Sequence, residues 1–187
     1  MVNPSRDLHQ LNPIVKQNVE LFLAFCKSKG LKVGISETYR SIERQDYLYS
    51  LGRTEKGAIV TNAKGTSMSS YHQWGLAVDF YQDHKGLEYE CSFMEQIGMY
   101  AEQFGFEWGG RWKNFKDVAH LQMSFGLSIQ ELKAGHKVEN QISQNYANAL
   151  NKLVKQGIIE QPGLWYQPEN MRRGHIESLI IKVAASL

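Results

Sequence analysis

Two histidines and an aspartate are the residues of this sequence whose types could do chemistry together. His72 and Asp79 lie in the segment SSYHQWGLAVDF (residues 69–80), and His120 lies in DVAHLQM (117–123). Two imidazoles and one carboxylate suit a divalent transition metal, and catalytic zinc sites commonly use three protein ligands and leave a fourth position for water. A single histidine is more often an ordinary core or surface residue. The expectation that His72, Asp79 and His120 bind one zinc ion therefore depends on their convergence.

Four further polar residues are candidates for the surroundings of this site. Asp117 lies three residues before His120 and could accept a proton from a metal-activated water, or it could simply cap a turn. Arg40 could bind an anionic group or an oxyanion by paired hydrogen bonds, although a lone arginine is more often a surface residue. Gln45 and Ser70 are weaker candidates of the same kind.

Short helices and strands must bring these residues together. The periodicity and the capping residues predict helices after Asn12-Pro13 and after Ser41, and a third from a capping box at 92–95 to about Gly105. They predict strands over 31–40, 76–80 and 117–123, with a long loop over 52–70. For this mixture of helices and short strands we expect an α+β fold with a small antiparallel sheet and flanking helices.

The strand that carries Asp79 explains how a carboxylate can lie in an apolar run. Asp79 shares one face of the strand with Ala77, while Leu76, Val78 and Phe80 point into the core. His72 is an odd number of residues away, so an unbroken strand would place it on the opposite face. Gly75 is expected to bend the chain and bring His72 round.

Five segments of the chain resemble the VanY-like (D-Ala-D-Ala carboxypeptidase-like) zinc metallopeptidases. The resemblance covers roughly residues 10 to 126, and its segments are YRS…RQ…LY..GR (39–53), IVTNAKG (59–65), SYHQWGLAVDF (70–80), FEWGGRW (106–112) and DVAHLQ (117–122). Within these enzymes the chain is most similar to the L-alanyl-D-glutamate endopeptidases of phage endolysins and bacterial cell-wall hydrolases.

The resemblance implies a fold, a reaction and roles for the candidate residues. It implies a hedgehog/D,D-peptidase-like fold, zinc bound by His72, Asp79 and His120, and hydrolysis of the L-Ala–D-Glu bond of peptidoglycan. Asp117 would be the general base, and Arg40 would hold the oxyanion or anchor the substrate, with Ser70 and Gln45 near the same pocket. Relatives often have WGGDW where this chain has Arg111, so Arg111 is a candidate contact for substrate carboxylates.

The C-terminal part of the chain is not explained by this resemblance. We expect a catalytic domain over residues 1–126, a linker over 127–140 and a small helical module over 141–187. That module could bind the cell wall through Trp165 and Tyr166, or it could be a helical hairpin that packs on the catalytic domain or pairs two chains.

Composition and alternative chemistries limit the other functions. A net charge of +2 gives no reason to expect a nucleic acid partner, and no apolar stretch suggests membrane insertion. The N-terminus shows no signal-peptide pattern, so we expect synthesis in the cytoplasm and holin-type release to the wall.

Three alternative functions stay open: a D,D-carboxypeptidase, a non-catalytic zinc domain that binds cell wall, and a non-haem iron oxygenase. The last is disfavoured because its acid usually lies two residues from the first histidine.

Overall fold

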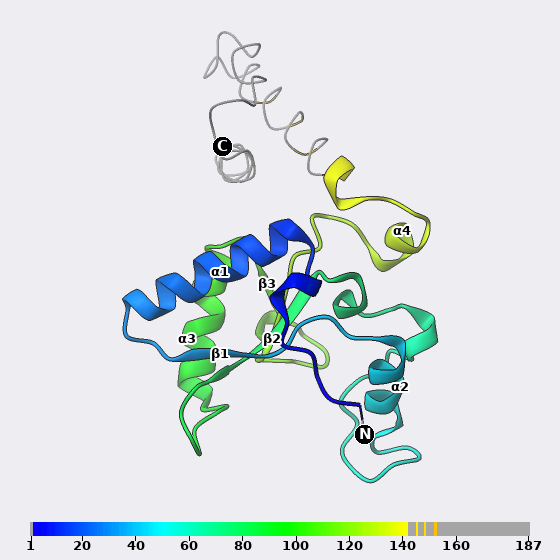
Figure 1. The fold of residues 1–187 in the computed structure, drawn as a ribbon, viewed down its shortest axis with the longest axis horizontal. Coiled ribbons are helices and arrows are strands. Elements are labelled where there is room, and N and C mark those ends of the chain that lie inside the picture. The colour runs from blue at the N-terminus through cyan, green and yellow to red at the C-terminus, as the bar shows by residue number, and fades with distance from the viewer. Residues whose placement is uncertain (1, 142–144, 146–147, 149–151, 153–187) are drawn as a thin grey trace. The chain divides into compact units, whose positions relative to one another are not determined.

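The structure is a computed structural model that describes residues 2–141, 145, 148 and 152 of the 187-residue chain (Figure 1). The chain divides into two compact units, one ending at Ser124 and one beginning at Phe125. Within the described residues, four short 3-10 helices accompany the larger elements; they span Leu8–Gln10 (η1), Gly65–Ser67 (η2), Tyr71–Trp74 (η3) and Gly109–Arg111 (η4). The helices and strands of the first unit are α1 (Pro13–Ser28), β1 (Val33–Glu37), α2 (Ile42–Ser50), β2 (Ala77–Gln82), α3 (Cys91–Glu102), β3 (Glu107–Trp108) and β4 (His120–Gln122).

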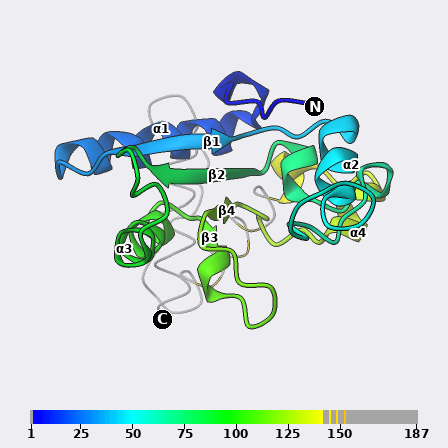
Figure 2. The same ribbon diagram turned by 90° about the horizontal axis from the view of Figure 1, so that it is seen from below.

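One antiparallel sheet organises the first unit. Its four strands lie in the order β1-β2-β4-β3, as Figure 2 shows. β2 is central, and its Asp79 pairs with Glu37 of β1 on one side and with His120 of β4 on the other. Residues that pair across neighbouring strands share a face of the sheet. The register therefore places Glu37, Asp79 and His120 in one row, and the expected α+β fold with a small antiparallel sheet is confirmed.

The apolar face of the sheet is covered by α1 and α3. Four side chains of α1 are fully buried at helical spacing, as the sequence predicts: Val15, Val19, Phe22 and Cys26. Aromatic contacts join α1 to α3 and to the turn after it, because Phe25 lies edge-on to Tyr100 and Phe22 packs against Phe104 and Phe106. Val78 and Phe80 of β2 complete this core, together with Leu76 just before the strand.

The caps confirm two predicted helix starts and correct a third. The Asn12 side chain accepts the Ile14 N–H with Pro13 at the first helical position, and Ser41 accepts the Arg44 N–H. The predicted capping box at 92–95 is wrong. The Glu90 carboxylate accepts the N–H groups of Ser92 and Phe93, so α3 begins at Cys91. A carboxylate at this position also interacts favourably with the helix dipole.

Two strands are shorter than the sequence predicts. β1 covers Val33–Glu37 rather than 31–40, because residues 38–40 leave the sheet, and a bulge lies between Ile35 and Glu37. β4 covers only His120–Gln122, since Asp117 accepts the Ala119 N–H and holds the preceding residues in a turn. Both cysteines are free: Cys26 is buried, as predicted, and Cys91 is exposed.

The packing of α3 on β3 requires a glycine. A methyl group at Gly98 would overlap the buried indole ring of Trp108. We expect Gly98→Ala to lower the free energy of unfolding by about 1–3 kcal/mol, as overpacking of a filled core does. Urea denaturation measures this. Met99→Ala, on the exposed side of the same helix, should change it by less than about 0.5 kcal/mol. Equal effects of the two variants would contradict this account of the packing.

The described part of the second unit contains α4 (Ile129–Lys133). The side chain of Ser128 and that of Glu131 form a reciprocal capping box at its start, so the stretch expected to be a linker holds a short helix. Most of the helical module expected over 141–187, including Trp165 and Tyr166, lies outside the described residues, and its role stays a prediction. In the described part of the chain, no helix has the length and apolar character needed to cross a membrane.

Candidate metal centre

His72 reaches the polar face of the sheet from η3. Gly75 ends this 3-10 helix with a left-handed backbone, φ +66°, so the bend expected from the sequence is present. The Nδ1 atom of His72 lies 2.7 Å from the carbonyl oxygen of Thr38. A carbonyl can only accept, so Nδ1 carries the ring proton and the lone pair of Nε2 points toward the centre. The ring itself is buried.

His120 is held by a second chain of hydrogen bonds. The Nε2 atom of His120 lies 3.1 Å from the Oε1 atom of Gln122, and the Nε2 group of Gln122 donates to Glu107 at 2.9 Å. The carboxylate of Glu107 therefore fixes the orientation of the Gln122 amide, so Nε2 of His120 must be the donor. The unprotonated Nδ1 then points toward the centre. Partners of this kind orient metal-binding histidines in many proteins.

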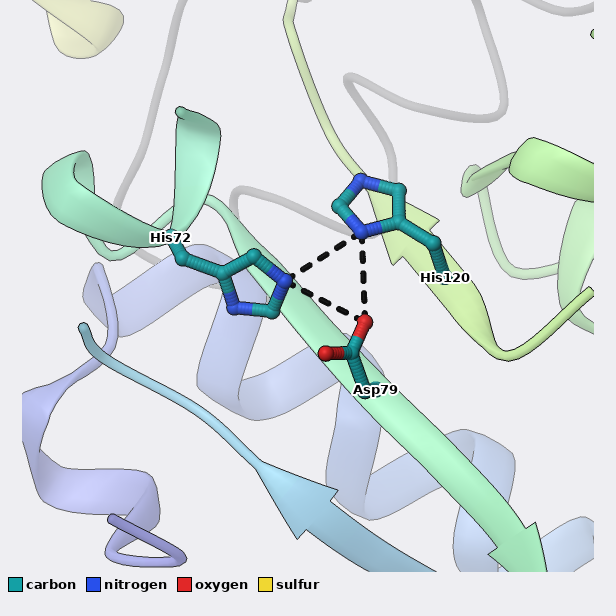
Figure 3. A group of neighbouring side chains, drawn as sticks. All are labelled: His72, Asp79 and His120. Carbon is teal, nitrogen blue, oxygen red and sulfur yellow. Dashed lines mark hydrogen bonds and ion pairs between the residues drawn. The ribbon is translucent and has the colours of Figure 1, made fainter. Parts of the chain in front are cut away.

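The three inward atoms form an equilateral triangle. The Nε2 atom of His72, the Oδ1 atom of Asp79 and the Nδ1 atom of His120 are each 3.2 Å from the other two (Figure 3). A tetrahedral site with bonds of 2.0–2.1 Å separates its ligand atoms by about 3.3–3.4 Å. In their neutral rings both histidines present lone pairs to a carboxylate, and three acceptors at this spacing repel one another without a cation. The triangle therefore has the size and the donor atoms of a zinc site.

The electrostatics of the cluster also favour a bound cation. Burial opposes the charge of Asp79, but the charges and hydrogen bonds of His72 and His120 hold its pKa well below the usual range. Burial lowers the pKa of His72. Burial also disfavours a charged His120, but a second ring proton would let Nδ1 donate to Asp79, and this bond together with the charges of Asp79 and Asp117 raises the pKa of His120 overall. The centre thus keeps an ionised carboxylate and attracts positive charge beside it.

The triangle lies in the wall of an open cavity of about 880 Å³. Asp117 lines the same cavity, as do the aromatic side chains of Trp112 and Phe115. The ring centroid of Trp112 is 5.0 Å from that of His120. One oxygen of Asp117 accepts the Ala119 N–H at 3.1 Å, which is the turn-capping contact considered above. A carboxylate fixed in this way beside the centre can also exchange a proton with a reactant in the cavity.

The remaining predicted site residues take different places. Ser70 and Arg40 line the cavity. Gln45 is fully buried behind it and donates to Thr61 and to the carbonyl oxygen of Ala63. Arg111 lies outside the lining of this cavity: it is exposed and forms a two-point ion pair with Glu102, with both N–O distances 2.9 Å.

Arg40 differs from its expected environment. It follows β1, is buried, and donates to Glu37, Gln45 and Asp79. These bonds use four of its five N–H groups, and a role for Arg40 toward substrate stays a prediction.

Several residues of the site were not identified from the sequence. Glu37 falls in the apolar phase of the β1 pattern, and the bulge after Ile35 turns it onto the face of Asp79. A charged residue at an apolar position was the available signal. Gln122 is two residues from His120 in the same strand and therefore lies on the same face. This spacing could have indicated the contact between their side chains. Nothing local in the sequence links Glu107 to Gln122.

Fold and site together fit the class of metallohydrolases, in which three protein ligands leave a position open toward a substrate cavity. A family model described as D-alanyl-D-alanine carboxypeptidase, of the M15 peptidases, matches residues 63–123. The peptidoglycan L-alanyl-D-glutamate endopeptidase CwlK of Bacillus subtilis is 45% identical over 125 residues, 60% of this chain and 73% of that protein. The chain therefore belongs to the M15 metallopeptidase family, and it is an enzyme.

Two further proteins are similar to this chain. The L-alanyl-D-glutamate peptidase of Listeria phage A118 is 30% identical over 176 residues, which cover 86% of this chain and 55% of that protein. The chain thus spans about half the length of the phage enzyme. Among solved structures, the L-Ala D-Glu endopeptidase ChiX of Serratia marcescens is 26% identical, with a TM-score of 0.49 over 63% of this chain and 84% of ChiX.

Proposed function

We propose that this protein is a zinc-dependent peptidoglycan hydrolase that cleaves the L-Ala–D-Glu bond of stem peptides. The observation that carries the metal assignment is the triangle of three acceptor atoms, 3.2 Å apart. The other ring nitrogen of each histidine donates away from the triangle, that of His72 to Thr38 and that of His120 to Gln122. The substrate is supported by the two curated relatives, since both are named for this activity.

The ligands of the proposed zinc ion are Nε2 of His72, Oδ1 of Asp79 and Nδ1 of His120. When bound, zinc supplies a Lewis acid that polarises the scissile carbonyl and lowers the pKa of a coordinated water toward about 7. The cavity beside the triangle leaves room for a peptide to approach the open side. The two histidines and Asp79 would thus hold the ion, and the negative charge of Asp79 would balance part of the positive charge of the zinc.

Asp117 is the proposed general base and acid. Its carboxylate lines the cavity and can accept the proton of the attacking water, then return it to the leaving amine of D-Glu. The backbone bond from Ala119 restricts its movement, which keeps the carboxylate available to the reactants. Proton transfer by a positioned carboxylate typically contributes a factor of about 10²–10⁴ to the rate.

Mass spectrometry of digested peptidoglycan tests the proposal. Purified murein from several bacteria is incubated with the protein and the new termini are identified. New N-terminal D-Glu or D-iso-Gln supports the proposed bond. Release of D-Ala would instead support a D,D-carboxypeptidase, the second candidate, which the description of the matching family model favours. Binding to murein without any released peptide would indicate a non-catalytic wall-binding domain. The holin route to the wall and the oligomeric state stay predictions.

The hydrogen bond behind His120 should contribute to metal affinity. Gln122→Ala removes the acceptor for the Nε2 proton of His120. We expect the zinc dissociation constant to rise about 10- to 100-fold, the usual effect of losing such a partner. Competition with a chromophoric chelator measures the constant. Gln130→Ala, at an exposed position of α4, is the control and should leave it unchanged. An unchanged affinity in Gln122→Ala would show that the contact does not orient the ring.

A further inference from the structure

A buried carboxylate, Glu37, joins two guanidinium groups beside the candidate metal centre. One of its oxygens accepts from Arg40 through Nη2 at 2.6 Å and Nε at 3.2 Å. The other accepts from Nε of Arg44 at 2.8 Å. Side chains that are this buried and fully charged are stable only when they are paired in this way. Glu37 therefore holds the position of both arginines.

Arg40 connects this cluster to the metal-binding carboxylate. Its Nη2 group donates to Oδ2 of Asp79 at 3.1 Å, while Oδ1 of the same carboxylate faces the two histidines. The β-bulge in β1 places Glu37 directly opposite Asp79 in the sheet. The hydroxyl of Ser36, within the bulge, also donates to the backbone carbonyl of Asp79 at 3.1 Å. Asp79 is thus fixed at its backbone and at its outer oxygen.

We propose that Glu37 and Arg40 are positioning residues that present Asp79 to the metal through a single oxygen. This inference rests on the proposed function, because it assigns residues that orient one of the proposed ligands. Arg40 holds Oδ2 and so prevents the carboxylate from turning both oxygens toward the ion. Glu37 in turn holds Arg40 by two hydrogen bonds to one oxygen. The four hydrogen bonds that Arg40 donates, to Glu37, Gln45 and Asp79, form without a substrate.

The charges explain why Glu37 is needed as well as Arg40. Arg40 and Arg44 together carry two positive charges, and Glu37 and Asp79 carry two negative charges, so the cluster is neutral before the metal binds. Without Glu37, Asp79 would be the only carboxylate paired with the buried guanidinium of Arg40. The oxygens of Asp79 would then be drawn toward Arg40 and away from the histidines. Glu37 therefore leaves Asp79 free to donate to the metal.

Zinc affinity and the absorption spectrum of the cobalt-substituted protein test the inference. The variants are Glu37→Gln, which removes the charge that holds both arginines, and Arg40→Lys, which keeps the charge but cannot donate to Glu37, Gln45 and Asp79 together. We expect both to raise the zinc dissociation constant about 10- to 100-fold and to shift the visible bands of bound Co²⁺. The bands report the geometry of the ligands around the ion, Asp79 among them, so a general loss of stability would not by itself move them.

A matched control is available elsewhere in the same domain. Glu102→Gln removes the carboxylate of another two-point arginine pair, that with Arg111, and should leave the zinc constant within twofold. Circular dichroism checks that each variant folds. If Glu37→Gln does not fold, the result for Arg40→Lys tests the inference alone. A constant within twofold and unshifted bands in folded Arg40→Lys overturn the inference, and a loss of turnover alone would then place Arg40 on the substrate. If the unaltered protein itself fails to bind one zinc ion, the proposed function fails instead.

Discussion

Asp117→Asn is expected to reduce kcat on peptidoglycan by roughly 10²–10⁴-fold while the protein still binds one zinc ion per chain. The physical reason is that asparagine keeps an oxygen that can accept the Ala119 N–H, so the turn before β4 persists. It cannot accept the proton of the attacking water at neutral pH. The variant therefore separates the catalytic role of Asp117 from its turn-capping role. Turnover of purified murein, followed by mass spectrometry, and zinc content measure the two properties.

The controls for this prediction use two other variants. Asp83→Asn changes the same functional group at an exposed position after β2 and should retain the activity of the unaltered protein. Asp117→Ala removes both the base and the cap, so it should lose activity and also some stability. If Asp117→Asn remained fully active while Asp117→Ala did not, the carboxylate would be a turn cap alone and another base would be required.

Removal of the metal should lower the rate of hydrolysis at least about 10³-fold. Without zinc the attacking water and the scissile carbonyl lose an activation that amounts to several kcal/mol, and each 1.36 kcal/mol corresponds to a factor of ten. Dialysis against a chelator followed by stoichiometric Zn²⁺ should abolish and then restore activity. Zinc at 100 to 1,000 times its dissociation constant should raise the free energy of unfolding by about 3–4 kcal/mol.

Single-ligand variants extend the test of the metal centre. His72→Ala should abolish both the activity and the zinc-dependent rise in stability, because it removes one corner of the triangle. His84→Ala, which changes a histidine at an exposed position, should retain both. Recovery of activity with Fe²⁺ and oxygen but not with Zn²⁺ would contradict the hydrolase and support the oxygenase alternative.

Local patterns were sufficient for much of the fold and for the three candidate ligands. The spacing of Val15, Val19, Phe22 and Cys26 predicts the buried face of α1, and these residues are buried. Helix periodicity and capping depend on residues only three or four apart, so they can be recognised without the tertiary structure. The predicted start of α3 was wrong because local signals can also compete with one another. Two local caps compete there, and Glu90 is preferred over the box that begins at Ser92.

The sequence by itself determined which residues can bind a metal, whereas only the tertiary structure decided how they are held. His72, Asp79 and His120 were candidates because of their chemistry and because a glycine bend allows them to meet. Their partners depend on strand register and on a bulge, which are set by contacts between segments far apart in the chain. For this reason the roles inferred for Glu37 and Gln122 required the structure. Arg111, selected because the resembling enzymes often have an aspartate there, lies in a surface ion pair with Glu102, and a contact of Arg111 with substrate stays a prediction.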